Sequence, residues 1–272
     1  QFLFAARDNP KIHNALLSLA KRMKFLQSGF AGMDAPILQD VLKIENVHIA
    51  NASSVYAIPI AHYVFSQILR WNKRIDHHIE YQQSKNWAPI AGDGELTNKT
   101  LVILGYGGIG SQVAKLGKAF GMRVTGIRRN PQEDEHADEV FGLDRFEELL
   151  PLTDYLVLAL PDSLHTRDII NVDILEKLNS SAMIINVGRG TAINEDDLAN
   201  ALNDGKIAAA ALDTTKVEPL DANSSLWTAK NCFISAHDSA HSLLSLERAF
   251  ELFFQNIKNI NNGDQIKNLY SE

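Results

Sequence analysis

The chain has 272 residues, which is enough for one large domain or two medium-sized ones. Hydrophobic residues make up 45% of it and charged residues 22%, so a largely disordered or collagen-like chain is excluded. The formal net charge of −7 argues against a nucleic-acid partner, because such binding needs a basic surface. The single cysteine, Cys232, rules out an intramolecular disulfide and a thiolate zinc cluster, and it favours a reducing compartment, the cytoplasm.

The chain contains no stretch that approaches the roughly 18 apolar residues of a membrane span, so we expect no membrane partner. Its opening residues, 1–7, lack the basic and apolar parts of a secretory signal and indicate a short strand that runs into a turn. Because the chain does not begin with Met, we expect that an N-terminal piece is absent from it.

In chain order, the first features are a strand-like segment at 24–27, a turn-like segment between Gly29 and Asp34, and a long helical pattern over 55–71. The polar stretch 73–98 follows, and we expect it to form a surface arm or loop. Apolar runs then predict strands at 101–104, 124–127, 155–160, 183–187, 207–212 and 232–234. Helical patterns lie between most of them, at 109–120, 146–150, 172–178 and 195–202, and a second long one covers 242–260.

Short apolar strands separated by amphipathic helices predict an α/β fold with a parallel sheet that is covered on both faces. We expect two domains. A larger one, residues 53–240, is inserted into a smaller one that is built from residues 1–52 and 241–272. The two long helices join the domains and predict a cleft between them.

The pattern G-x-G-x-x-G is formed by Gly105, Gly107 and Gly110, between a predicted strand and a predicted helix. In this context it predicts a dinucleotide-binding loop. The first glycine permits the tight turn, the second lets the backbone approach a pyrophosphate, and the third allows helix and strand to pack closely. The N–H groups at the helix N-terminus then face the anion. The alternative is a glycine-rich turn without a ligand.

The end of the next strand distinguishes the two nicotinamide dinucleotides. An NAD enzyme commonly carries an acidic residue about 20 positions after the first glycine, where it holds the ribose 2′-hydroxyl. This chain has Arg128 and Arg129 there instead. Guanidinium groups attract the 2′-phosphate of NADP, so we expect NADP(H) to be preferred, with NAD(H) as the second option. The alternative interpretation is a solvated basic turn.

Four motifs in order resemble those of the D-isomer-specific 2-hydroxyacid dehydrogenases. They are the segment 101–110; the segment 186–190 followed by 194–198; the segment 211–213 with 218–220 five residues later; and Leu226-Trp227 followed by 235–237. The resemblance extends from about Phe25 to Asn259. It implies two Rossmann-like domains, a larger NAD(P)-binding domain inserted into a smaller, flavodoxin-like substrate domain.

The resemblance places the catalytic residues of the family at Arg189, Glu218 and His237. These residue types suit the reduction of a 2-oxo acid. Arg189 can pair with the substrate carboxylate, and His237 can protonate the alkoxide that hydride transfer produces. Glu218 would hold the other imidazole nitrogen. Each residue alone could be an ordinary loop or surface residue, but the joint order and spacing favour the catalytic interpretation.

The resemblance also implies further contacts. For the cofactor these are Gly108, Ile109, Leu160, Pro161, Thr166, Val187, Gly188 and Asp213, and for the substrate carboxylate they are the backbone N–H groups of Ala31 and Gly32, in a loop that continues to Asp34. Trp227 is either a wall of the pocket or a packing residue. Ala236 departs from the family, which usually has Pro there, and Ala61 stands where a Glu is usual. We expect no metal site, because His237 and His241 lack an adjacent helical Glu.

The sequence therefore predicts an oxidoreductase that interconverts small 2-oxo acids and D-2-hydroxy acids, similar to glyoxylate and hydroxypyruvate reductases. A phosphoglycerate dehydrogenase-type enzyme and a non-catalytic, dinucleotide-sensing corepressor are the alternatives. A Rossmann enzyme with another adenosine cofactor is disfavoured by the arginine pair and the catalytic set. The resemblance further implies a homodimer, with the arm 73–98 as a candidate contact. Which 2-oxo acid is the substrate stays open.

Overall fold

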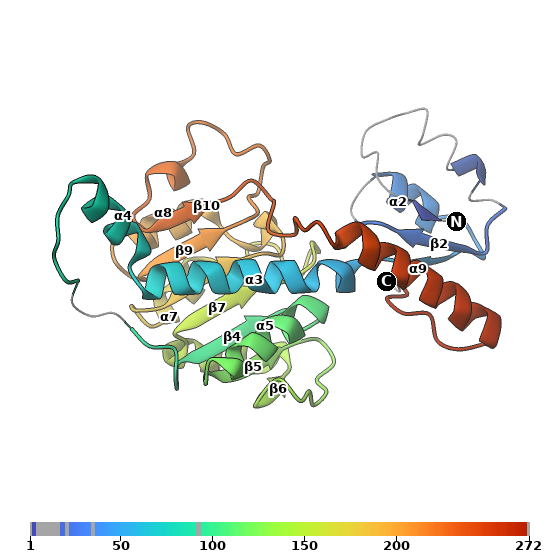
Figure 1. Cartoon of the computed structure of the whole chain (residues 1–272), viewed down its shortest axis with the longest axis horizontal. Helices are drawn as coiled ribbons and strands as arrows, with labels where there is room; N and C mark the ends of the chain where they lie inside the picture. Colours follow the sequence, from blue (N-terminus) through green and yellow to red (C-terminus); the bar gives the residue numbers. More distant parts are fainter. Residues whose placement is uncertain (1, 4–16, 20–21, 34–35, 91–93, 271–272) are drawn as a thin grey trace. The chain divides into compact units, whose positions relative to one another are not determined.

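The structure is a computed structural model, and it describes residues 2–3, 17–19, 22–33, 36–90 and 94–270 (Figure 1). The chain divides into two compact units. The smaller unit comprises residues 1–58 and 241–272, and the larger unit comprises residues 59–240. The predicted division into a substrate domain and a cofactor domain is a statement about function, and it stays a prediction.

The smaller unit contains a three-stranded parallel sheet in the order β1 (Phe2–Leu3), β2 (Phe25–Ser28) and β3 (His48–Ala50). Helices α2 (Pro36–Leu42) and α9 (Ser245–Asn262) also belong to it. Apolar side chains from the strands and from α2, such as Leu26, Leu38 and Ile49, form its core. The strand predicted at 24–27 is β2, and most of the strand-and-turn segment predicted at 1–7 lies outside the described residues.

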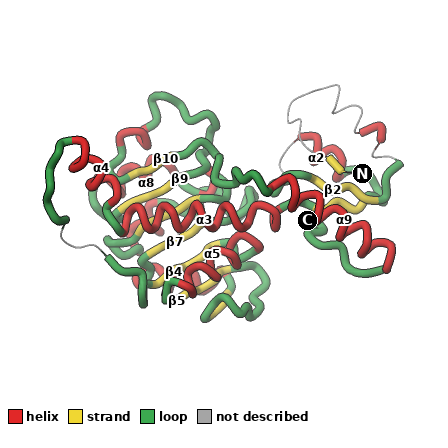
Figure 2. Tube along the Cα trace, viewed as in Figure 1, coloured by secondary structure: helices red, strands yellow, loops and turns green. Residues whose placement is uncertain are grey.

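The larger unit is built on a seven-stranded sheet in the order β10-β9-β8-β7-β4-β5-β6, and every neighbouring pair is parallel. Figure 2 labels five of these strands, in the order β10, β9, β7, β4 and β5. The strands are β4 (Thr100–Leu104), β5 (Arg123–Ile127), β6 (Glu139–Phe141), β7 (Tyr155–Leu158), β8 (Met183–Asn186), β9 (Ala209–Leu212) and β10 (Cys232–Ile234). The predicted parallel α/β fold is confirmed. β4 and β7 are adjacent although β5 and β6 lie between them in sequence, so the strand order reverses here, and ligands bind at such a point at the carboxyl ends of the strands.

Helices cover both faces of this sheet because the buried strand residues alternate between the faces. The helices along this part of the chain are α3 (Ser53–Asn72), α4 (Ile75–Gln83), α5 (Gly108–Ala119), α6 (Phe146–Leu149), α7 (Val172–Lys177) and α8 (Glu195–Asn203), of which α4 has no buried residue. Helix α5 packs closely on one face, where a methyl group at Gly117 would lie 2.8 Å from the Leu101 side chain. On the other face, Val102 and Leu104 share a core with Leu175 of α7 and Leu198 of α8.

Several local predictions need correction. The segment 73–98, expected to be a surface arm or loop, contains the helix α4, which was not predicted because its few apolar residues, such as Ile75 and Ile79, stand among polar ones. The strand predicted at 155–160 ends at Leu158, and the helix predicted to begin at residue 242 begins at Ser245. The short edge strand β6, which is only partly buried, was not predicted. In the described part of the chain, no helix combines the length and the hydropathy that crossing a bilayer requires.

Candidate functional site

The loop between β4 and α5 has the close contacts that its glycines were expected to make. Gly105 adopts a φ of +101°, which side-chain-bearing residues rarely adopt, and a methyl group there would lie 2.6 Å from the carbonyl oxygen of Ala159. A methyl group at Gly110 would lie 2.9 Å from the carbonyl oxygen of Gly105. These two glycines therefore let the turn, the loop after β7 and the start of α5 pack against one another.

Gly107 and Gly108 differ from these two glycines because they face open space. A methyl group at either position would meet no atom within 4 Å. Gly107 is the N-cap of the twelve-residue helix α5 and makes no side-chain capping bond, so the first N–H groups of that helix are available to a ligand. This open cradle of backbone amides at the carboxyl end of β4 fits the pyrophosphate of a dinucleotide.

The end of β5 carries the two arginines on which the cofactor prediction depends. Arg128 is half-buried and Arg129 is exposed. Beside them, the ring of Tyr106 covers Gly126, and its hydroxyl donates to Oδ1 of Asp134 at 3.0 Å. Burial raises the pKa of Tyr106 well above its usual value. Asp134, which no sequence motif marks, thus ties the loop after β5 to the glycine loop.

The loop that contains Arg189 is held by the side chain of Asn186, which is fully buried at the end of β8. Its Oδ1 accepts from the N–H of Gly188 at 3.1 Å, and its Nδ2 donates to the carbonyl of Arg189 at 3.0 Å. A methyl group at Gly188 would lie 2.6 Å from the carbonyl oxygen of Leu160, so this loop packs on the loop after β7. The Arg189 guanidinium donates to the carbonyl of Gly188 at 3.0 Å.

The segment after β7 is shaped by its own polar side chains. The Thr166 hydroxyl donates to the carbonyl of Pro161 at 2.8 Å and accepts from the N–H of Ser163 at 3.0 Å. Asp162 accepts from Arg167 and from the Thr191 hydroxyl, and the bond from Arg167 holds the pKa of Asp162 below its usual value. Leu160, Pro161 and Thr166 therefore belong to one ordered loop at the switch point of the sheet.

Glu218 and His237 are in direct contact. Nδ1 of His237 lies 2.8 Å from Oε2 of Glu218, and both side chains are about one-third exposed, at 33% and 39%. The other carboxylate oxygen of Glu218 accepts from the N–H of Thr215 at 3.3 Å. The backbone of Thr215 lies in turn against Gly190, where a methyl group would come within 1.9 Å of its carbonyl carbon. These contacts connect the loop of Arg189 to the pair formed by Glu218 and His237.

Asp213, at the end of β9, has an almost fully buried carboxylate, with 1% of the residue exposed. It accepts from the Ser235 hydroxyl at 2.7 Å and from the N–H groups of Asp238 and Ser239 at 3.0 and 3.1 Å. The carbonyl of Asp213 accepts from the N–H of His237 at 2.8 Å. In this arrangement Asp213 holds the histidine loop, and the predicted contact with the cofactor stays a prediction.

The remaining predicted residues each lie in their own part of the chain. Ala31 and Gly32 are half-buried in the loop after β2 of the smaller unit, whereas Asp34 lies outside the described residues. Trp227 is 54% exposed, and its indole N–H donates to the carbonyl of Asp221 at 2.9 Å, which secures its own loop. No group of three or more His, Cys, Asp or Glu residues could hold a metal ion in the described ranges.

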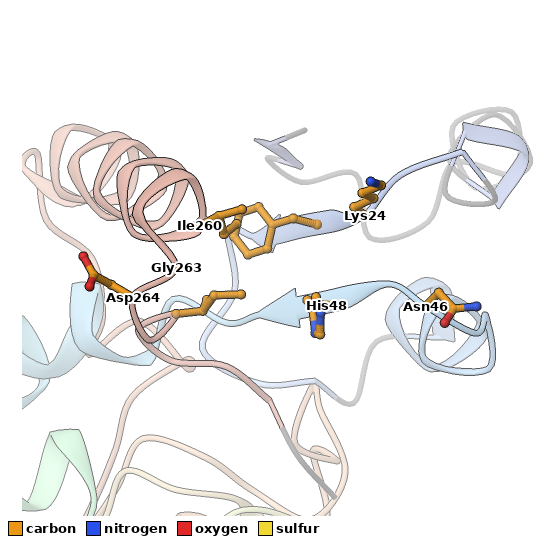
Figure 3. A pocket seen from close by; sticks show the side chains of 8 residues that line it. Lys24, Asn46, His48, Ile260, Gly263 and Asp264 are labelled. Carbon is orange, nitrogen blue, oxygen red and sulfur yellow. The ribbon is translucent and has the colours of Figure 1, made fainter.

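A cavity of about 460 Å³ lies in the smaller unit (Figure 3). It is lined by Lys24, Phe25, Asn46, His48, Ile260, Gly263, Asp264 and Ile266. Lys24 precedes β2 and His48 begins β3, so the cavity opens at the amino ends of these strands. Parallel sheets bind ligands at their carboxyl ends, so the candidate site is the cluster at the carboxyl ends of β4, β7, β8, β9 and β10.

Comparisons with known proteins identify the family that the chain matches. A family model described as "D-isomer specific 2-hydroxyacid dehydrogenase, NAD binding domain" matches residues 65–239. The chain is 33% identical to glyoxylate reductase of Aeropyrum pernix over 230 residues, which cover 82% of this chain and 68% of that one.

Two solved structures are similar over nearly the whole chain. One is a D-isomer specific 2-hydroxyacid dehydrogenase family protein from Aeromonas salmonicida, with a TM-score of 0.82, 31% identity, and coverage of 97% of this chain and 83% of that one. The other is an NADPH-dependent glyoxylate/hydroxypyruvate reductase from Sinorhizobium meliloti in complex with NADP and sulfate. It has a TM-score of 0.81 and 25% identity, and the match covers 99% of this chain and 84% of that one.

Proposed function

Because this chain belongs to the D-isomer specific 2-hydroxyacid dehydrogenase family, we propose that it reduces glyoxylate and hydroxypyruvate with NADPH. As a member of that family it is an NAD(P)-dependent oxidoreductase that acts on CH–OH donors. The observation that carries the proposal is the pair of His237 and Glu218, 2.8 Å apart, at the sheet edge that also holds the glycine loop. The relatives named for these two substrates support the choice of substrate class.

His237 is the proposed acid. Its Nδ1 is engaged by the carboxylate of Glu218, so that nitrogen keeps its hydrogen, and Nε2 is left to hold the proton for the substrate oxygen. Glu218 also stabilises the charged imidazolium that reduction requires. The N–H of Thr215 orients the same carboxylate. The nicotinamide, when bound, supplies the hydride. In the reverse direction, His237 accepts the proton at Nε2.

Arg189 is the proposed partner of the substrate carboxylate. A guanidinium suits this role because its planar fork donates two parallel hydrogen bonds to a carboxylate. Its backbone is held on one side by Asn186 and on the other by the close packing of Gly190 on Thr215. Such a fixed loop reduces the freedom that the side chain would lose on binding substrate.

The preference for NADPH is proposed from the charges at the end of β5. Arg128 and Arg129 stand where NAD enzymes carry an acid, and the nearby carboxylate of Asp134 is engaged by Tyr106. We expect Arg128→Asp combined with Arg129→Ala to raise the Kd for NADPH at least tenfold more than the Kd for NADH. Arg123→Ala, at the opposite end of β5, is the matched control. Equal losses for the two cofactors would overturn the assignment.

The decisive assay follows the oxidation of NADPH and NADH in parallel against glyoxylate, hydroxypyruvate and phosphohydroxypyruvate. We expect the fastest turnover with NADPH and one of the two unphosphorylated acids. His237→Gln should lower kcat by about 10²- to 10⁴-fold, the usual contribution of a general acid, and should still bind NADPH. His241→Gln is the matched control. Turnover of His237→Gln within a few-fold of the wild type would remove His237 from the mechanism.

We also propose that the chain forms a homodimer through the arm 73–98. Helix α4 exposes Ile75 and Ile79, and Trp87 beyond it is fully exposed. Exposed apolar side chains that are close in sequence are typical of an interface. Sedimentation at micromolar concentration should give the mass of a dimer, and Ile75→Glu with Ile79→Glu should shift it to that of a monomer. A wild-type chain that sediments as a monomer would refute the dimer.

A further inference from the structure

The backbone of His237 has an unusual conformation for a residue with a bulky side chain. Its φ is +54°, in the left-handed region that mainly glycine and asparagine adopt. Such a conformation persists only where neighbouring contacts enforce it. Here the contacts come from Asp213, whose carbonyl accepts from the N–H of His237 and whose carboxylate accepts from the N–H groups of Asp238 and Ser239. The orientation of His237 therefore depends on the position of Asp213.

A chain of hydroxyl groups fixes the Asp213 carboxylate from the other side. The Ser235 hydroxyl lies 2.7 Å from Oδ1 of Asp213 and 2.7 Å from the hydroxyl of Tyr63, which is on helix α3. An ionised carboxylate only accepts, so the single proton of Ser235 is donated to Asp213. Ser235 must then accept from Tyr63. Burial raises the pKa of Tyr63 to about 12, so this tyrosine keeps its proton over the working range of an enzyme.

We propose that Tyr63, acting through Ser235, is a positioning residue for the proposed acid His237. The hydrogen bond from Tyr63 leaves Ser235 one orientation, in which its proton points at Asp213. Asp213 then holds residues 237–239 so that the imidazole faces Glu218. This inference rests on the proposed role of His237. Its direct consequence, the orientation of the His237 ring, can be measured whether or not the substrate has been identified.

Tyr63→Phe removes only the hydroxyl, and Ser235→Ala removes the link. We expect Tyr63→Phe to lower kcat about tenfold, with the Kd for NADPH and the KM for the oxo acid changed less than twofold. Ser235→Thr, which keeps the hydroxyl, should retain most of the activity. The double variant should be no worse than Ser235→Ala, because Tyr63 acts through Ser235. Losses that multiply in the double variant would overturn the proposal.

The matched control is Tyr155→Phe. Tyr155 is buried, its hydroxyl donates to Asn72 at 3.4 Å, and it begins β7, at the amino edge of the sheet, away from the site. It should leave kcat unchanged. If the wild type turns over, His237→Gln does not, and Tyr63→Phe equals the wild type, then the positioning role fails while the proposed function stands.

A second readout does not need turnover. The imidazole nitrogen resonances of His237, assigned by their loss in His237→Gln, should move in Tyr63→Phe and Ser235→Ala and stay in place in Tyr155→Phe. Unmoved His237 resonances in both hydroxyl-deletion variants would refute the positioning role, even for a protein whose substrate lies outside the panel.

Discussion

Gly190→Ala tests the contact on which the arrangement of the site depends. The methyl group of alanine would lie 1.9 Å from the carbonyl carbon of Thr215, 2.2 Å from its oxygen and 2.4 Å from the nitrogen of Lys216. Ordinary van der Waals contact begins at 3.4 Å, so the nearest atom is 1.5 Å too close. All three neighbours are backbone atoms, and they cannot rotate away as a flexible side chain would.

The expected cost is large because two backbone segments must separate. An extra methylene in a packed interior lowers the free energy of unfolding by about 1–3 kcal/mol. Because the clash here is against backbone atoms, we expect a loss of about 3 kcal/mol or more. For a unit of this size, about 1 kcal/mol corresponds to about 2–4 °C, so we expect the melting temperature to fall by about 6–12 °C. The folded fraction of the Gly190→Ala variant should also have a lower turnover rate. Separating Gly190 from Thr215 displaces Arg189, which precedes Gly190, and the N–H of Thr215, which donates to Glu218.

The assay is thermal unfolding followed by circular dichroism, together with the NADPH oxidation rate. Gly108→Ala is the matched control because it makes the same substitution in open space, at the first residue of α5. It should melt within about 2 °C of the wild type, since the methyl group meets no atom and alanine restricts the unfolded chain. If Gly190→Ala also melts within about 2 °C of the wild type, then the close packing of Gly190 on Thr215 is refuted.

Three further predictions concern stability and reactivity. Thr214 is buried, and its hydroxyl has no hydrogen-bond partner among the described residues. Thr214→Val should therefore raise the free energy of unfolding by about 1 kcal/mol and the melting temperature by about 2–4 °C. A lower melting temperature would mean that the hydroxyl is hydrogen-bonded. Burial raises the pKa of the Cys232 thiol to about 12. Iodoacetamide at pH 8 should therefore label this thiol slowly in the folded protein and rapidly in urea, because the thiolate is the reactive form. Fast labelling without urea would contradict the raised pKa. A hydrogen bond from Lys118 lowers the pKa of Asp138, so its stabilising effect is complete above its unfolded pKa of about 4 and is lost on acidification below it. Urea unfolding should therefore show Asp138→Asn to be less stable than the wild type at pH 7, and the difference should shrink as the pH falls below about 4. A difference that stays constant on acidification would contradict this role of Asp138.

The parallel sheet could be predicted because each central strand is a short run in which almost every residue is apolar. In β4 and β7, residues such as Val102, Ile103 and Leu156 are fully buried, and a strand covered on both faces needs no polar alternation. The edge strand β6 and the helix α4 escaped prediction for the converse reason. Helix α4 has no buried residue and the three-residue strand β6 is only partly buried, so neither shows the run of apolar residues that marks a buried element.

The sequence by itself determined the family, the fold class and the candidate residues, because glycine loops and the motifs around Arg189, Glu218 and His237 are local patterns. Only the tertiary structure decided which side chains support them. Tyr63 and Ser235 are 172 residues apart, and the contacts of Gly190 with Thr215 and of Gly105 with Ala159 join loops from different strands. Such contacts follow from the order of strands in the sheet and from the packing of helices on it, and no local pattern of residues records either.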